Sequence, residues 1–257
     1  MTDRTLFETA AVLSAQPSIR HGFFGRQGGV SAGAFSSLNV SETSGDNRTL
    51  VGENRRRVAE ALEYSARSLV TITQVHSSQV IVISDLEHVY GQEGDALVTK
   101  LPGICLGILT ADCAPVLFSD PASGVVGAAH AGWKGALDGI VEETVEAMCA
   151  LGAQRTRIIA AIGPTISLDK YEVGPDFTRD FLARRPDAAP YFSSSLGKRE
   201  HFDLPGFVSA QLKSAGILHV EQVGGCTYAN ADRYFSHRYA SHKAEVTGRQ
   251  MAAIGLN

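Results

Sequence analysis

The sequence of 257 residues is poor in the features that mark membrane proteins and nucleic-acid binders. No run approaches the roughly 18 apolar residues of a membrane-spanning helix, and the first residues lack the pattern of an export signal. The net charge is -4, and lysine and arginine gather in no stripe of the kind that binds nucleic acid. The densest basic run, 55–57, predicts a solvated helix face. We therefore expect a cytoplasmic protein without a membrane or nucleic-acid partner.

Cysteine is also scarce, because the chain has only Cys105, Cys113, Cys149 and Cys226. Four cysteines in a chain of this size do not make a disulfide framework, and reduced thiols fit a cytoplasmic compartment. The absence of a C-x2-C pair argues against a zinc-finger pattern, and no Walker A loop is present. Any metal or anion site must therefore be assembled from residues that are distant in the sequence.

Short apolar runs bounded by Gly, Pro, Asp or Ser predict strands, and apolar residues at three- to four-residue steps predict helices. The expected strands are 80–83, 104–109, 115–118, 125–129 and 157–162, and the expected helices run from Ala136 to Leu151 and between Pro205 and Gly216. The stretch 184–200 is the most loop-like, but periodic segments continue on both sides of it. The mixture predicts one α/β (α+β) domain over residues 1–257, a mixed-sheet sandwich with helices packed on the sheets.

Two of these runs flank an Asp-Pro turn and predict a hairpin that brings a cysteine and a histidine together. A four-residue loop over Asp120 to Ser123 would place Cys113 directly opposite His130. Directly opposed residues have Cβ atoms roughly 4.5–5.5 Å apart, which suits two ligands of one metal ion. Other interpretations stay open: a lone cysteine on a strand is often a small buried hydrophobe, and a slip of one residue would separate the two side chains.

A glycine-rich turn, Ala131 to Gly135, leads from this hairpin into the expected helix. Such a turn presents unpaired backbone N–H groups and the positive end of the helix dipole, which together can bind an anion. Lys134 would add a point charge, and Arg26 in a polar loop is a second candidate. Glycines at a strand-to-helix turn are commonly only geometric, so that alternative also stands. His76, just before the strand 80–83, has no partner that spacing identifies.

Ten segments carry motifs that recur in the same order along one known family. They are His21 to Ser31, Gln74 to Ser77, Gly94 to Leu97, Thr110 to Val116, Ala129 to Gly135, Ile162 to Pro164, Tyr171 to Gly174, Cys226 to Tyr228, Phe235 to Arg238 and Thr247 to Gln250. On these segments the sequence resembles the YfiH-like family, also called laccase-domain or multicopper polyphenol oxidase-type proteins and regarded as purine nucleoside phosphorylases. The resemblance implies one α/β domain and a catalytic zinc site of His76, Cys113 and His130.

The resemblance also implies an activity and its partners, a small-molecule nucleoside and phosphate. The implied reactions are phosphorolysis of adenosine, inosine and S-methyl-5′-thioadenosine, and hydrolytic deamination of adenosine. Phosphorolysis needs an anion pocket near the metal, for which Arg26 and Lys134 are the candidates, with Gln74 and Asp112 as polar groups of the pocket. The family usually has Arg at Lys134, which weakens a bidentate grip on an oxyanion. It usually has an aromatic residue at His237, whose role stays open.

Three alternatives remain at this point, and the oligomeric state is undetermined. A copper-dependent polyphenol oxidase would use Cu2+, but eight histidines without a His-x-His pair are poorly suited to a multicopper cluster. A hydrolase could use Cys113 as nucleophile with His130 or His76 as base. The resemblance further implies a role in editing peptidoglycan precursors in some bacteria. A single His₂Cys site with an open position fits zinc best.

Overall fold

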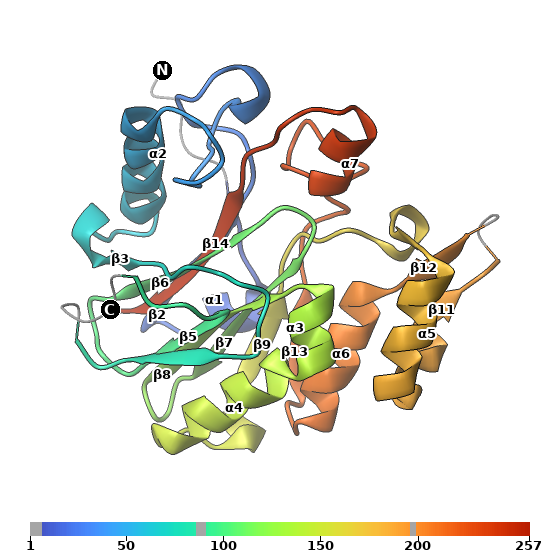
Figure 1. Cartoon of the computed structure of the whole chain (residues 1–257). Helices are drawn as coiled ribbons and strands as arrows, with labels where there is room; N and C mark the ends of the chain where they lie inside the picture. The colour runs from blue at the N-terminus through green and yellow to red at the C-terminus, as the bar shows by residue number, and fades with distance from the viewer. Residues whose placement is uncertain (1–6, 86–90, 196–198) are drawn as a thin grey trace.

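The computed structural model describes residues 7–85, 91–195 and 199–257 (Figure 1). The strands are β1 (Phe7–Glu8), β2 (Ile19–Phe24), β3 (Leu69–Val70), β4 (Val80–Ile83), β5 (Ala96–Thr99), β6 (Cys105–Thr110), β7 (Ala114–Asp120), β8 (Val125–Ala131), β9 (Ile159–Ile162), β10 (Glu172–Val173), β11 (Phe192–Ser193), β12 (Glu200–Phe202), β13 (His219–Gln222) and β14 (Gln250–Leu256). They form three sheets, a five-stranded sheet β1-β2-β14-β6-β3, a six-stranded sheet β13-β9-β7-β8-β5-β4 and a small sheet β10-β12-β11.

The helices fill the connections between these strands. They are α1 (Ala11–Ser14), α2 (Arg48–Ala61), α3 (Trp133–Asp138), α4 (Ile140–Ala150), α5 (Pro175–Arg184), α6 (Leu204–Ser214) and α7 (His237–His242), with the 3-10 turns η1 (Gly33–Phe35), η2 (Ala66–Ser68), η3 (Arg155–Arg157), η4 (Leu168–Lys170) and η5 (Pro186–Tyr191). None of the helices in the described ranges is long and apolar enough to cross a lipid bilayer.

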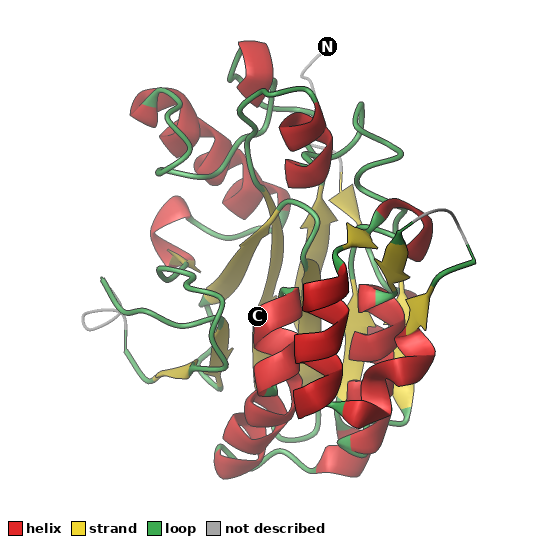
Figure 2. Ribbon diagram, turned by 45° about the vertical axis from the view of Figure 1, so that its right-hand side comes forward, coloured by secondary structure: helices red, strands yellow, loops and turns green. Residues whose placement is uncertain are grey.

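The two large sheets pack face to face, and helices cover their outer faces (Figures 1 and 2). Successive side chains of a strand point to opposite faces, which fixes these layers. Along β14, Met251 and Ala253 pack toward α2, whereas Ala252 and Ile254 enter the core between the sheets. The fold class predicted from the sequence, a mixed-sheet sandwich with helices packed on it, is confirmed.

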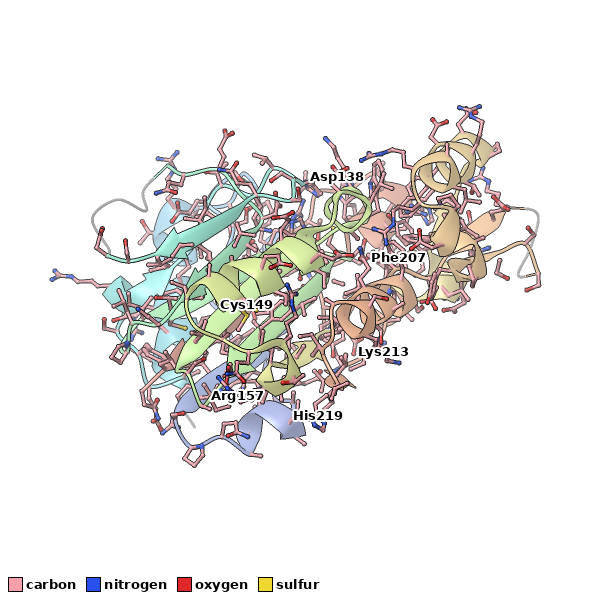
Figure 3. The ribbon with its side chains drawn as sticks, turned by 90° about the horizontal axis from the view of Figure 1, so that it is seen from below. Asp138, Cys149, Arg157, Phe207, Lys213 and His219 are labelled. Carbon is pink, nitrogen blue, oxygen red and sulfur yellow. The ribbon has the colours of Figure 1, made fainter. Side chains whose placement is uncertain are left out.

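The outer face of the six-stranded sheet carries the largest apolar core. In Figure 3, α4, which carries Cys149, and α6, which carries Phe207 and Lys213, run side by side across this face. Val116 and Phe118 of β7 contribute to the core on this side. The expected helix after Pro205 is therefore confirmed as α6, which begins behind the Asp203 cap and ends before Gly216.

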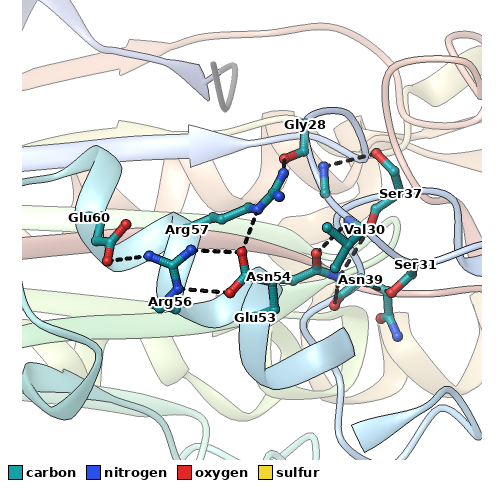
Figure 4. Close-up of polar contacts among 11 residues, drawn as sticks. Gly28, Val30, Ser31, Ser37, Asn39, Glu53, Asn54, Arg56, Arg57 and Glu60 are labelled. Atoms are coloured by element: carbon teal, nitrogen blue, oxygen red, sulfur yellow. Dashed lines mark hydrogen bonds and ion pairs between the residues drawn. The ribbon is translucent and has the colours of Figure 1, made fainter. Parts of the chain in front are cut away.

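Helix α2 carries the basic run 55–57 on the opposite side of the molecule. Its cap is Asn47, whose side chain accepts from the backbone N–H of Thr49 and Leu50. Figure 4 shows Arg56 and Arg57 both bound to Glu53, as expected of a helix face that meets solvent. The side chain of Arg55 is only 18% exposed, so the prediction of a solvated face is wrong for this residue.

Other differences between the predicted and observed elements lie at a helix break and at strand ends. The helix expected from Ala136 to Leu151 is divided into α3 and α4, because Gly139 adopts φ 89°, a left-handed conformation that interrupts the helix. The strands match their predictions to within one or two residues at most ends. The stretch 184–200 contains η5, β11 and the start of β12, and residues 196–198 of it lie outside the described ranges.

The predicted hairpin exists as β7 and β8, but its register differs by two residues. Asp120 pairs with Val125, so the loop is 121–124 and His130 lies opposite Pro115 rather than Cys113. Asp120 remains the last paired residue of β7. Its carboxylate accepts from the backbone N–H of Ala122 within the turn, and Pro121 has no backbone N–H to donate to a neighbouring strand. Cys113 consequently lies just before the first residue of β7.

Candidate metal centre

His76, Cys113 and His130 converge at one end of the six-stranded sheet. Each offers one ligand atom, and these three atoms lie within 4.8 Å of one another. The rings of His76 and His130 are 4.8 Å apart between centroids and almost perpendicular, at 76°. Within the described ranges, no other group of His, Cys, Asp and Glu side chains has this arrangement. Despite the two-residue error in register, the sequence identified three residues that the fold brings together.

A buried carboxylate, Asp95 at the start of β5, holds two of these residues in place. Its Oδ1 lies 2.8 Å from Nδ1 of His130 and accepts from the backbone N–H of His76 at 3.0 Å. Its Oδ2 accepts from the backbone N–H and the hydroxyl of Ser77. Because a carboxylate only accepts, Nδ1 of His130 carries the proton, and the lone pair of Nε2 is left for a metal ion.

The charges of the site favour a thiolate. Burial raises the pKa of the Cys113 thiol, but the charges and hydrogen bonds of His130 and His76 outweigh it and lower this pKa to about 6. Burial lowers the pKa of His130, but Cys113 and Asp95 together raise it to about 9. Burial raises the pKa of Asp95, and hydrogen bonds from His130 and Ser77 bring it down to about 2. These pKa values describe a Cys113 thiolate and a protonated His130 beside an ionised Asp95, and a bound metal ion would take the place of the proton on Nε2 of His130.

Gly132, in the turn after β8, packs directly against all three side chains. A Cβ atom at this position would lie 2.9 Å from Sγ of Cys113, 3.2 Å from Cδ2 of His76 and 3.7 Å from Cε1 of His130. The first of these distances is shorter than a carbon–sulfur contact allows. Glycine is thus required here by the space that the convergent side chains occupy, and the interpretation of this glycine as a geometric residue is the better one.

The three side chains line a pocket of about 680 Å³. Gln74 and His237, both singled out from the sequence, line it as well. The Gln74 amide is occupied, since it donates to the carbonyl of Leu109 and accepts from the N–H of the same residue at 2.8 Å. Gln74 therefore fixes one wall of the pocket by clamping the end of β6.

Asp112 supports the site from behind and does not line the pocket. Its Oδ1 accepts from the Thr227 hydroxyl and its Oδ2 from the backbone N–H of Arg238, both at 2.6 Å. Asp112 also adopts φ 90°, a conformation that strains a residue with a side chain. These bonds hold the strained turn that presents Cys113 to the pocket.

Arg26 and Lys134, the predicted anion ligands, are not brought to this pocket. Arg26 lines a separate pocket, and its guanidinium donates to the carbonyls of Ser36, Ala231 and Ala34. Lys134 is exposed at the second position of α3, a helix of only six residues. The loop around Arg26 closes on its guanidinium, and the first turn of α3 directs Lys134 outward. The sequence motifs specify neither arrangement.

Several residues that line or support the site have no local signal in the sequence. Asp95 belongs to a motif of the family resemblance, but its bond to His130 spans 35 residues and no spacing indicates it. Three arginines, Arg55, Arg67 and Arg249, line the pocket, but the sequence assigned Arg55 to a solvated helix face, placed Arg249 only in a family motif and gave no role to Arg67. The segment 29–33 has the G-x-S-x-G spacing of a serine hydrolase, but the hydroxyl of Ser31 is tied to the Asp46 carboxylate at 2.7 Å in a loop.

Curated proteins and solved structures are similar to the chain over most of its length. A purine nucleoside phosphorylase of Deinococcus radiodurans is 43% identical over 242 residues, which cover 93% of this chain and 90% of that protein. The purine nucleoside phosphorylase ORF3 of Streptomyces griseus is 36% identical over 93% of this chain and 95% of its own length. The crystal structures of NMB0706 from Neisseria meningitidis and YlmD from Geobacillus stearothermophilus align with TM-scores of 0.85 and 0.86, at 32% and 30% identity.

Both structures are similar to this chain over almost its whole length. NMB0706 covers 99% of the chain and is itself covered to 99%, and YlmD covers 98% and is covered to 99%. Residues 20–257 match the family described as multi-copper polyphenol oxidoreductase laccase. With the fold, the sequence motifs and these relatives in agreement, the chain belongs to the YfiH-like, laccase-domain family.

Proposed function

We propose that the chain is a single-domain, zinc-dependent purine nucleoside phosphorylase of the cytoplasm. The observation that carries the proposal is the convergence of His76, Cys113 and His130 on a pocket of about 680 Å³. This volume lies within the range typical of small-molecule sites, roughly 300–1,000 Å³. The names of the relatives supply the substrate class, a purine nucleoside and phosphate.

The donor set fits a zinc ion. Zinc binds imidazole nitrogen at about 2.0–2.1 Å and thiolate sulfur at about 2.3 Å, and a catalytic site keeps one position open. The three donor atoms are close enough for one ion, and Gly132 keeps the space between them clear of a side chain. His76, Cys113 and His130 would hold the ion, which supplies a Lewis acid and an open position for an oxygen ligand.

In phosphorolysis, the bond between C1′ of the ribose and N9 of the purine breaks, and a bond forms between C1′ and a phosphate oxygen. The purine leaves with a proton on nitrogen, so atoms and charge balance. The chain must hold both reactants together and keep its own ligands fixed. Asp95 keeps His76 and His130 fixed, and Asp112 keeps the turn that carries Cys113 fixed. His237, at the pocket wall, is close to where a substrate would lie.

The proposed substrates are adenosine, inosine and S-methyl-5′-thioadenosine, and a second proposed reaction is hydrolytic deamination of adenosine. Deamination needs an activated water in place of phosphate, and a zinc ion held by His76, Cys113 and His130 would supply the Lewis acid that activates it. The two reactions are separated by their products, since only phosphorolysis requires phosphate and releases the base.

A second candidate is a cysteine hydrolase, with a peptidoglycan precursor among its substrates. Its support is the low pKa of Cys113, about 6, beside two imidazoles, which is the arrangement of an activated nucleophile. A metal ion bound to the thiolate would block this role. Copper binds such donors more strongly than zinc and could occupy the same site. Copper found in the purified protein would favour the polyphenol oxidase alternative.

The test measures the metal content of the purified protein by emission spectroscopy, together with base release from the three nucleosides with and without phosphate. The proposal expects about one zinc per chain, base release only with phosphate, and loss of activity on chelation that zinc restores. Full activity in protein freed of metal would overturn the metal mechanism and favour Cys113 as nucleophile. Activity on muramyl precursors but not on nucleosides would favour the second candidate.

A further inference from the structure

Three arginines from separate parts of the chain line the pocket beside the metal centre. Arg55 comes from α2, Arg67 from η2 and Arg249 from the residue before β14. The wall between them is rich in hydroxyl groups, including those of Thr71 and Thr110. Arginine presents a planar fork of N–H groups that matches the oxygens of phosphate.

Arg249, like Arg55, is partly buried, whereas Arg67 is exposed. The Nη1 of Arg249 donates to the carbonyls of Thr247 and Gly248, and no carboxylate within the described ranges lies within 4.0 Å of its guanidinium. Cys113 and Asp112 attract it from a distance, but Cys113 belongs to the candidate metal centre and Asp112 already accepts hydrogen bonds with both oxygens. Taking a cation out of water without a counter-ion is costly. The guanidinium of Arg249 is thus set up to meet an anion.

Thr110 provides an independent sign of a missing partner. It is 2% exposed and lines the same pocket, and its Oγ1 has no hydrogen-bond partner among residues 7–85, 91–195 and 199–257. Buried polar groups are almost always hydrogen-bonded, so an orphaned hydroxyl calls for a ligand or water. Thr110 pairs with Gln250 across β6 and β14, which places it one residue from Arg249 along the sheet.

Arg55 has a different setting from Arg26, the residue that the sequence favoured. Its Nη2 donates to Thr71 Oγ1 at 2.6 Å, and Glu42 approaches its Nε only to 3.8 Å. Its Nη1 donates to the carbonyl of Val40 at 3.3 Å, so these contacts orient Arg55 along the pocket wall. Arg26, by contrast, spends its guanidinium on three carbonyls outside this pocket.

We propose that Arg249, Arg55 and Thr110 form an oxyanion subsite that binds inorganic phosphate beside the metal centre. Arg67, exposed at the rim and without a polar partner in the described part of the chain, draws the anion in. Each guanidinium donates to phosphate oxygens, and the Thr110 hydroxyl donates to one more. The identity of the anion rests on the proposed function, whereas the subsite itself rests on the arginines and Thr110.

Calorimetric titration of the full chain with inorganic phosphate, at measured metal content, tests the subsite. Arg249→Gln should raise the Kd for phosphate roughly 10- to 100-fold, because a charge-assisted hydrogen bond is lost. Thr110→Val should raise it roughly 3- to 10-fold. Thr110→Val should leave the Tm unchanged or higher, since the hydroxyl has no hydrogen-bond partner among the residues that the structure describes. A structural hydroxyl would instead lower the Tm when removed.

Arg56→Gln is the matched control, because Arg56 lies on α2 next to Arg55 but, in the described part of the chain, binds only Glu53 and Glu60. Its Kd for phosphate should equal that of the wild type. An unchanged Kd in both Arg249→Gln and Thr110→Val would overturn the subsite, even if nucleosides are turned over. Phosphate binding that depends on Arg249, in a protein that releases no base from nucleosides, would overturn the proposed function and leave the subsite standing.

Discussion

The Asp95 carboxylate binds Nδ1 of His130 at 2.8 Å and the backbone N–H of His76 at 3.0 Å. One oxygen, Oδ1, therefore orients two of the three candidate metal ligands. His76 adopts φ 59°, a conformation that a residue with a side chain rarely takes, and the Asp95 carboxylate holds the turn that contains it. The precision of the site consequently depends on a residue that does not itself line the pocket.

Replacing this carboxylate should weaken the metal site more than the fold. In Asp95→Asn, the amide nitrogen cannot accept, so either His130 or Ser77 loses its acceptor. We expect zinc affinity to fall roughly 10- to 100-fold, as for other residues that support metal-binding histidines. Competition with a chromogenic chelator measures this change. Asp176→Asn, on the exposed face of α5, is the control, and equal affinities in the two variants would contradict the assigned role of Asp95.

Gly132 should be intolerant of even one methyl group. In Gly132→Ala, the new Cβ would meet Sγ of Cys113 at 2.9 Å, so the turn or the ligand must move. We expect the zinc content per chain to fall well below that of the wild type while the circular dichroism spectrum of the fold is retained. Gly52→Ala is the control, because a Cβ there meets nothing within 4 Å. It should keep full zinc content and unfold at an equal or higher temperature. A Gly132→Ala protein with full zinc content would contradict this prediction, because it would show that the turn can shift without loss of the metal site.

Much of the fold could be predicted because buried strands leave a local signal. The runs around β4, β6, β7 and β8 are apolar and bounded by turn residues, and they were located to within two residues. The register of the hairpin was not predictable from the turn residues, because a four-residue loop can begin at Asp120 or at Pro121. The buried Asp120 side chain and its bonds within the turn decide between them.

The site was predictable only where residue type and family motif coincide. His76, Cys113 and His130 carry chemistry that is recognisable in the sequence. The contributions of Asp95 and Arg249 are contacts made across the fold, and neither residue lies at a motif spacing that identifies a partner. Arg26 illustrates the reverse error, because an arginine beside glycines looks like an anion ligand until its partners, the carbonyls of Ser36 and Ala231, are known.

The stability of the protein should decrease as the solution becomes acidic, in part through His21. This histidine of β2 is 4% exposed, and its Nε2 accepts from the backbone N–H of Ala10, so it is neutral in the fold. Burial lowers its pKa from 6.5 to about 4, against the opposing attraction of Glu221. The unfolded chain therefore binds the proton first as the pH falls, and stability that is complete above pH 6.5 is lost down to about pH 4.

The expected loss from His21 alone is about 3 kcal/mol across this window. Urea unfolding at several pH values measures it, and His21→Gln should give a shallower dependence of the unfolding free energy on pH than the wild type. His219→Gln, which replaces an exposed histidine of β13, should leave the slope unchanged. Parallel slopes for the wild type and His21→Gln would show that the fold does not lower the pKa of His21.

Cys113→Ser should separate metal chemistry from thiol chemistry. The hydroxyl is nearly isosteric but stays neutral, so the site loses an anionic, soft donor while the hairpin of β7 and β8 still folds. We expect zinc content and phosphate-dependent base release to fall together, each by at least roughly tenfold. Cys149→Ser is the matched control, since Cys149 lies on α4 over the apolar core (Figure 3) and belongs to no ligand group. It should keep both properties. Emission spectroscopy and the base-release assay are made on the same preparation of Cys113→Ser. A variant that retained zinc but lost all turnover would show that the sulfur acts in the chemical step itself.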